Sequence, residues 1–182
     1  FVTMYVTADN LANVRTIADN TVSTDTETDT VHIYGGYFKL TENLTNIGDK
    51  FVFAGNNTAG EFIGVVDGNG YKITSKLNNQ YHNGVFGYLN NATIKNIAIE
   101  VTSVSMVTAV YWGRASLVEN VYVKATINTA DGYSNGDSAV IGGGLYNTTF
   151  ATVMRNVVIN VAMKEGVAFT FVWNKGRARE KY

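Results

Sequence analysis

From Val31 onward the chain consists of short apolar runs that alternate with turns rich in glycine and asparagine. The runs occupy residues 31–40, 51–54, 62–66, 71–74 and 84–89. Short apolar runs between turn-forming residues are typical of β-strands, and no amphipathic helical period interrupts them. The pattern therefore predicts an all-β architecture for this part of the chain.

The N-terminal segment, up to Thr30, differs from the rest. Residues 8–19 read as an α-helix, with Asp9 or Asn10 as candidates for its N-cap. The apolar positions that share one face of this helix are Leu11, Val14, Ile17 and Ala18. Residues 21–30 are rich in threonine and aspartate without an apolar period, which predicts a solvated loop. Residues 1–30 are thus expected to form an N-terminal cap.

One phrase recurs around three asparagines, Asn96, Asn120 and Asn156. Each has an apolar residue two or three positions before it and a polar residue directly before it. An apolar-x-apolar triplet follows each asparagine; the triplets begin at Ile97, Val121 and Val157. The second interval between the asparagines is half as long again as the first. The longer spacing predicts an inserted loop, placed either in residues 129–137 or in residues 145–150.

A second phrase precedes each asparagine phrase, in residues 84–89, 107–112 and 139–145, and residues 167–173 begin one more. Repeats that cannot bury an apolar face alone bury it by stacking. We therefore expect a parallel β-helix, a solenoid, over residues 31–173, with the helix covering its N-terminal end. Asparagines at one place in successive coils can bond one another as amide ladders. The alternative is an antiparallel sandwich, which has no need of a fixed asparagine register.

Composition narrows the class of protein. The chain has 182 residues, enough for one domain, and a net charge of −1, which gives no basic patch for nucleic acid. It has no apolar run long enough for a membrane span, so no membrane insertion is expected. Cysteine and proline are absent, so glycine and asparagine must make the turns. The start at Phe1 rather than Met is expected of a processed product or a fragment.

Three motifs resemble a known family: Asp67-Gly-Asn-Gly-Tyr-Lys-Ile-Thr74, Gly84-Val-Phe-Gly-Tyr-Leu89 and Ala92-Thr-Ile-Lys-Asn-Ile97. They are similar to the GLUG-type repeats of large bacterial surface proteins, and comparable coils occur in phage tailspikes and fibres. The resemblance covers residues 62–99 well and extends loosely to residue 161. It implies a right-handed, pectin-lyase-like β-helix in which the motif residues are structural. Those residues here are Asp67, Gly68, Gly70, Asn96, Asn120 and Asn156.

No catalytic set is assembled in the sequence. Glycoside hydrolysis needs two carboxylates on either side of the scissile bond, whereas the acidic residues here are scattered. Asp131 and Asp137 flank a Gly-Tyr-Ser-Asn-Gly stretch and are the remaining candidates for paired catalytic carboxylates or a calcium site. Neither His32 nor His82 has a partner at metal-ligand spacing, so no metal or other cofactor is expected.

Aromatic residues are the better candidates for ligand binding. Tyr122 lies between inward Val121 and Val123, so the strand period turns it outward. An outward tyrosine can stack on a sugar ring, pack against another subunit or simply shield the sheet. Tyr111, Trp112 and Tyr133 are further candidates from the repeat region.

The sequence thus favours a non-catalytic β-helix module of a cell-surface or virion protein. Its expected roles are adhesion, host or glycan recognition, or structural assembly, with a surface glycan or other subunits as partners. The alternative is a polysaccharide lyase or glycoside hydrolase on the same fold. Trimerisation, as in tailspikes and fibres, is a third alternative. Residues 169–173 are apolar, and the basic tail, residues 174–182, could either dock on another subunit or simply be solvated.

Overall fold

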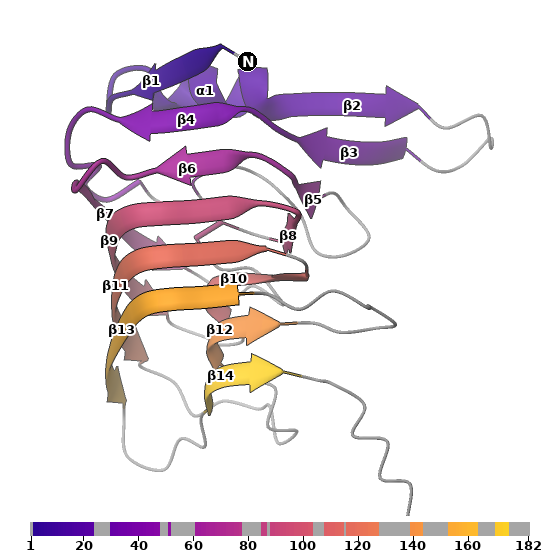
Figure 1. Cartoon of the computed structure of the whole chain (residues 1–182). Coiled ribbons are helices and arrows are strands. Elements are labelled where there is room, and N and C mark those ends of the chain that lie inside the picture. Colours follow the sequence, from indigo (N-terminus) through magenta and orange to yellow (C-terminus); the bar gives the residue numbers. More distant parts are fainter. Residues whose placement is uncertain are drawn as a thin grey trace, which may run out of the picture.

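The computed structural model describes residues 2–23, 30–47, 51, 61–77, 85–86, 88–103, 108–114, 116–127, 139–143, 153–163 and 170–174. These residues form two seven-stranded sheets and one helix, α1 (Leu11–Ala18). The predicted all-β class is therefore confirmed. Figure 1 shows the strands of each sheet lying one below the other along the molecule, with α1 at the N-terminal end.

The first sheet contains the longest strands. Its strands are β1 (Thr3–Val6), β4 (Tyr37–Leu40), β6 (Val65–Asp67), β7 (Lys72–Leu77), β9 (Thr93–Ser103), β11 (Leu117–Ile127) and β13 (Val153–Met163). The order is β1-β4-β6-β9-β11-β13, and β7 pairs with the second half of β9. All of these pairs are parallel.

The second sheet has the order β14-β12-β10-β8-β5-β3-β2. Its strands are β2 (Asp19–Ser23), β3 (Thr30–Tyr34), β5 (Glu61–Phe62), β8 (Tyr88–Asn90), β10 (Thr108–Arg114), β12 (Ala139–Gly143) and β14 (Thr170–Asn174). Its pairs are parallel except for the β2–β3 hairpin. From β3 onward the chain moves back and forth between the sheets, and only β6 and β7 are consecutive in one sheet.

Small residues mark the passage from the second sheet to the first. Gly36, Gly64, Ala92 and Ser116 each stand directly before a strand of the first sheet. Each carbonyl oxygen of this row accepts a hydrogen bond from the N–H that begins the next strand, such as Val65 to Gly36 at 2.8 Å. A Cβ on Gly64 would overlap the Gly36 oxygen, so the corner has no room for a side chain there. The runs 31–40 and 62–66, each predicted as one apolar stretch, are therefore divided between two sheets.

The inserted residues before Asn156 are divided as well. In the second sheet Leu89 pairs with Gly113, and Gly113 pairs with Gly143. In the first sheet Thr93 pairs with Leu117, and Leu117 pairs with Val153. In both sheets more residues separate the second pair of positions than the first pair. The number of extra residues in the second sheet is half the number of extra residues in the first sheet. Half of the insertion thus precedes β12 and half follows it. The sequence offered one site or the other, and the register uses both.

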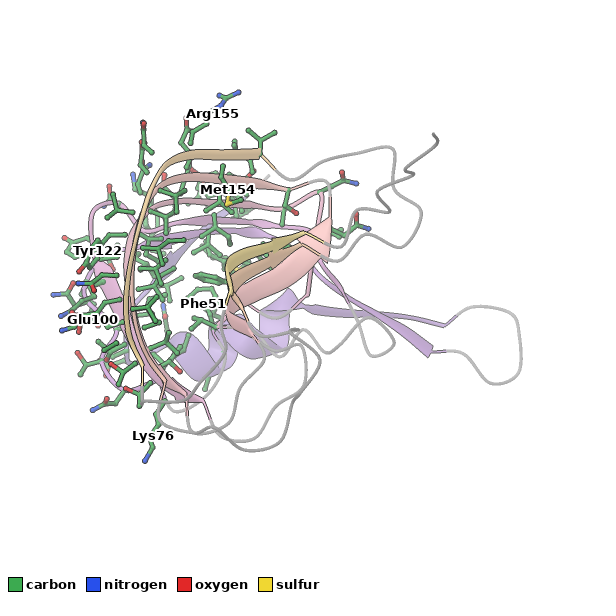
Figure 2. All side chains as sticks on the ribbon, turned by 90° about the horizontal axis from the view of Figure 1, so that it is seen from below. Phe51, Lys76, Glu100, Tyr122, Met154 and Arg155 are labelled. Atoms are coloured by element: carbon green, nitrogen blue, oxygen red, sulfur yellow. The ribbon has the colours of Figure 1, made fainter. Side chains whose placement is uncertain are left out.

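The core lies between the two sheets and is lined by fully buried aliphatic and aromatic side chains. A chain of phenylalanines runs through it, with Phe38 contacting both Phe62 and Phe51, and Phe51 contacting Phe86, at ring distances of 5.9–6.1 Å. Figure 2 shows Phe51 on the inner side of the curved first sheet. Rings at this spacing contribute contact energy beyond their buried area.

The N-terminal region departs from the prediction in two ways. The helix is present, and Leu11 and Val14 are buried in the core, but it spans Leu11–Ala18 rather than residues 8–19, and Thr7 and Asn10 bond each other in the turn before it. The Thr7 N–H donates to Asn10 Oδ1 at 2.9 Å, and the Asn10 N–H donates to Thr7 Oγ1 at 3.3 Å. The predicted solvated loop over residues 21–30 is wrong at its start, because residues 19–23 form β2 and pair with β3. A polar sequence of Asp, Asn and Thr suits an edge strand, which needs no apolar period.

Candidate functional site

The outer face of the first sheet carries the most exposed aromatic residue of the repeat region that the structure describes. Tyr122 of β11 is 39% exposed, which confirms the predicted outward direction. In register with it stand Ala98 of β9 on one side and Val158 of β13 on the other. Ala98 is small and Val158 is itself well exposed, so these neighbours leave part of the Tyr122 side chain accessible. Figure 2 shows Tyr122 and Glu100 pointing away from the core.

Polar side chains border this aromatic position. Two residues further along the strands, Glu100, Lys124 and Asn160 are in register. Glu100 also accepts an ion-pair hydrogen bond from Lys72 at 3.4 Å. A flat aromatic ring with hydrogen-bonding groups beside it is the arrangement that binds a sugar ring or a protein surface. We call Ala98, Tyr122, Val158, Glu100, Lys124 and Asn160 the tyrosine face.

Just before the asparagine positions, the outward residues of five neighbouring strands alternate in charge. In register from β4 to β13 they are Lys39, Asp67, Lys95, Glu119 and Arg155. Two ion pairs are formed in this row, Lys95 with Asp67 at 3.5 Å and Arg155 with Glu119 at 3.9 Å. Both acids of the row thus lie within ion-pair distance of a cation in register with them.

Asp67 makes the most polar contacts of this row. Its Oδ1 accepts from the Asn69 N–H at 3.0 Å and from Asn96 Nδ2 at 3.1 Å, and its Oδ2 accepts from the Tyr37 hydroxyl at 3.2 Å. Burial alone would raise the pKa of this carboxyl, but the donors from Asn69 and Asn96, together with Lys95 and Tyr37, outweigh it and lower the pKa. Asp67 was predicted as a turn former, and it is also the head of a ladder.

That ladder consists of the three predicted asparagines. Asn96 donates to Asp67, Asn120 Nδ2 donates to Asn96 Oδ1 at 3.0 Å, and Asn156 Nδ2 donates to Asn120 Oδ1 at 3.0 Å. All three asparagines have φ between 50° and 53°, a left-handed conformation that asparagine tolerates better than most residues. This turn inserts one residue into the strand period, so Ile94 and Ile97 both face the core.

The glycines of the Asp67 motif are structural for two different reasons. A Cβ on Gly68 would overlap the Ile97 Cβ and lie 2.5 Å from the Asn96 oxygen, so only glycine lets this turn rest on β9. Gly70 has open space around it, but its φ of 84° disfavours any side chain. The turn thereby brings Asp67 and Asn96 into contact.

Other predicted site residues are not placed. Asp131, Asp137 and Tyr133 lie outside the described residues, as do His82 and residues 175–182 of the basic tail. Tyr111 and Trp112 belong to β10, but their side chains are not among those described. Within the described ranges, no group of three or more His, Asp or Glu residues is arranged to hold a metal ion. The calcium alternative rests on residues outside those ranges.

Sequence reasoning missed Tyr37 and Lys95. The Tyr37 hydroxyl bonds Asp67 of a different strand, and Lys95 Nζ lies 5.7 Å from the centre of the Tyr37 ring. A signal for Lys95 was present, because the residue before each asparagine alternates between basic and acidic: Lys95, Glu119 and Arg155. No comparable signal points to Tyr37.

No protein-family model, curated protein or solved structure matches the chain. Among the described residues, no helix combines the length and the hydropathy that crossing a membrane requires. The case for a function therefore depends on the geometry described above.

Proposed function

We propose that the chain is a right-handed parallel β-helix related to GLUG-type, pectin-lyase-like repeats. We further propose that it serves as a non-catalytic recognition or assembly module on a cell surface or virion. The passage of the chain between two parallel sheets supports the solenoid, as does the asparagine ladder that joins equivalent positions. In this arrangement each coil contributes one strand to each sheet, except that β6 and β7 follow one another in the first sheet.

One observation carries the non-catalytic part of the proposal. The acids that the repeat brings together are engaged in stacking: Asp67 accepts three hydrogen bonds and an ion pair, and Glu119 is paired with Arg155. Glu100 is paired with Lys72 in the same way. What remains accessible on this face is the tyrosine face, whose composition suits binding rather than bond cleavage. Its ligand is proposed to be a surface glycan.

The enzyme alternative draws on the divided insertion. Its two halves flank β12, and the first half contains Asp131 and Asp137. Loops that interrupt a regular scaffold are frequent sites of catalysis. A polysaccharide lyase or glycoside hydrolase would therefore be expected to depend on Asp137 and not on Tyr122 alone.

A glycan array combined with a reducing-end assay tests both ideas. We expect saturable glycan binding without release of reducing ends. Tyr122→Ala is expected to lower the affinity at least about fivefold, because a stacked aromatic ring contributes about 1–3 kcal/mol. Tyr122→Phe retains the ring and should retain most of the binding.

Tyr5→Ala is the matched control, because Tyr5 is an exposed tyrosine of β1, in the same sheet but far from the tyrosine face. It should bind as the unmodified chain does. Turnover that disappears in Asp137→Ala would establish the enzyme alternative instead. Glycan binding that Tyr122→Ala leaves unchanged would remove the tyrosine face from the proposal.

A further inference from the structure

Strand β13 has one unpaired edge among the described residues. It pairs with β11 over its whole length, from Val153 to Met163, and no described strand follows it in the first sheet. Figure 1 shows β13 as the last strand of this sheet. An exposed strand edge presents a row of backbone N–H and C=O groups that a further strand can pair with.

The apolar row behind this edge is also incompletely covered. Met154 is 37% exposed, although the residues in register with it, Phe38, Val66, Ile94 and Val118, are all fully buried. Val157, Ile159 and Val161 are only partly buried, whereas their partners Val121, Val123 and Ala125 are buried. Figure 2 shows Met154 on the inner side of the sheet and Arg155 on its outer side. Burial of these side chains by one more strand would be favourable.

The charge row specifies what that strand must carry. The row alternates from Lys39 to Arg155, and Arg155 is 63% exposed at its end. Its contact with Glu119 is long, at 3.9 Å, so the guanidinium group has donors to spare. The next position in the alternation is acidic.

The asparagine ladder adds a second requirement. Asn156 donates its amide N–H to Asn120, and no described residue donates to Asn156 Oδ1. The same oxygen accepts an amide N–H in both Asn96 and Asn120. The residue that follows in the ladder must therefore donate an amide N–H, and asparagine does so while tolerating the left-handed turn.

We propose that the outer edge of β13 binds a parallel β-strand of defined chemistry. That strand carries an acidic residue opposite Arg155, an asparagine opposite Asn156 and aliphatic residues opposite Val157, Ile159 and Val161. The inference rests on the proposed stacking of coils and gives the assembly role its partner. It does not involve Tyr122, the residue that the glycan experiment changes, so failure of either experiment leaves the other interpretable.

The chain itself supplies the probe. Residues 117–127 of β11 contain Glu119-Asn120-Val121 followed by Val123 and Ala125. In the folded chain this segment already pairs with β13, on the edge of β13 opposite to the unpaired one. A fluorescent peptide with this sequence is titrated with the unmodified chain by anisotropy. A matched peptide with lysine in place of its glutamate is titrated in parallel, and so is one with alanine in place of its asparagine.

We expect the glutamate peptide to bind saturably and at least fivefold more tightly than either variant peptide, in line with opposite-charge and like-charge cross-strand pairs. Arg155→Glu, a change at an exposed position, should reverse the preference between the glutamate and lysine peptides. The reversal reports that this residue lies opposite Arg155. Only a parallel strand then also places the next residue, the peptide's asparagine, opposite Asn156, and the alanine peptide tests that second contact. Binding should also slow hydrogen exchange at β13 amides.

Three results would overturn the proposal: no saturable binding, equal affinity for the glutamate and lysine peptides, or a preference that Arg155→Glu does not change. Self-association of the chain through β13 is a fourth. It would appear as a concentration-dependent mass that the peptide cannot reduce, and it would assign the edge to a second copy.

Discussion

The two ends of the first sheet are finished differently. At the N-terminal end α1 lies beside β1, and Leu11 and Val14 belong to the same core as Val6 and Leu40. At the C-terminal end Met154 continues an inward row whose other members are buried, yet it is partly exposed. A stacked sheet buries each level with the next, so both ends need cover. Among the described residues, α1 therefore covers the N-terminal end of the sheet, and no element covers the C-terminal end in the same way.

A charged residue in each end should show the largest difference. Val14→Asp places a carboxylate among buried side chains, and we expect it to lower the free energy of unfolding by about 3 kcal/mol or more. Met154→Asp places the same group where water already reaches, and it should cost well under half as much. Urea denaturation followed by circular dichroism measures both.

Val2→Asp serves as a control for an added carboxylate near the same end, because Val2 is 84% exposed. It should be nearly neutral. Equal losses for Val14→Asp and Met154→Asp would contradict the assignment of a covered and an open end.

The head of the ladder should be the next most sensitive position. Asp67→Ala leaves the Asn69 N–H, the Asn96 amide and the Lys95 ammonium without their shared acceptor, and we expect a loss of about 2–3 kcal/mol. Asp67→Asn keeps one acceptor oxygen and should lose roughly half of that. Urea denaturation again supplies the measurement.

A matched change near the open end is Glu119→Ala, which removes an acid of the same row whose ion pair with Arg155 is long and exposed. Its expected cost is at most about 0.5 kcal/mol. A larger loss from Glu119→Ala than from Asp67→Ala would show that the row, and not the ladder head, stabilises the sheet.

Much of the arrangement of the first sheet could be predicted from the sequence, because the repeated phrase determines the register of its strands. The phrase around Asn96, Asn120 and Asn156 gave the register of β9, β11 and β13, since a left-handed turn and an amide ladder require the same residue at each level. Strand period gave the outward direction of Tyr122. These features depend on local sequence.

The sequence did not reveal where the ladder begins. At the level of β6 the acceptor for Asn96 is the side chain of Asp67, which is in register with Lys95 and not with Asn96. The turn that follows is longer than its counterpart in β9, since Asp67 pairs with Lys95 but Lys72 pairs with Ala98. An alignment on asparagine therefore stops at Asn96. The row of small residues that precede strands of the first sheet was not predicted for a similar reason. Its members share small size but not identity: Gly36, Gly64, Ala92 and Ser116. A repeat in the sequence shows which residue types recur. Stacking of strands depends instead on the size of a side chain and on the hydrogen-bond donors it offers.

The pH dependence of stability should distinguish the two ends of the ladder, because Asp67 titrates and Asn156 does not. The folded chain lowers the pKa of Asp67, so the unfolded chain binds more protons between the folded pKa and the ordinary value near 4. The resulting stabilisation is complete above about pH 4 and is lost as pH falls through the folded pKa. One titrating group changes the unfolding free energy by at most about 1.4 kcal/mol per pH unit.

Urea midpoints of the unmodified chain and of Asp67→Asn, measured across the acid range, isolate this contribution as the difference between the two curves. Parallel curves would mean that Asp67 is not linked to folding. At alkaline pH the sign is opposite. Burial opposes the charge on Lys95, but Asp67 and Tyr37 outweigh it and raise its pKa. That stabilisation is fully present below about pH 10.4 and is lost as pH rises through the folded pKa.

The smallest effect should separate the last two asparagines. Asn120→Gly and Asn156→Gly both suit the left-handed backbone, with φ of 53° and 50°, so neither change adds strain. Asn120 makes two ladder bonds and Asn156 makes one, and both residues lie at exposed positions. We expect losses of about 1–2 kcal/mol for Asn120→Gly and about 0.5 kcal/mol for Asn156→Gly.

If the peptide of residues 117–127 occupies the β13 edge, Asn156 gains a second bond, and in its presence the cost of Asn156→Gly should rise toward that of Asn120→Gly. A cost that stays the same with the peptide bound would mean that the ladder ends at Asn156 and does not continue into the partner.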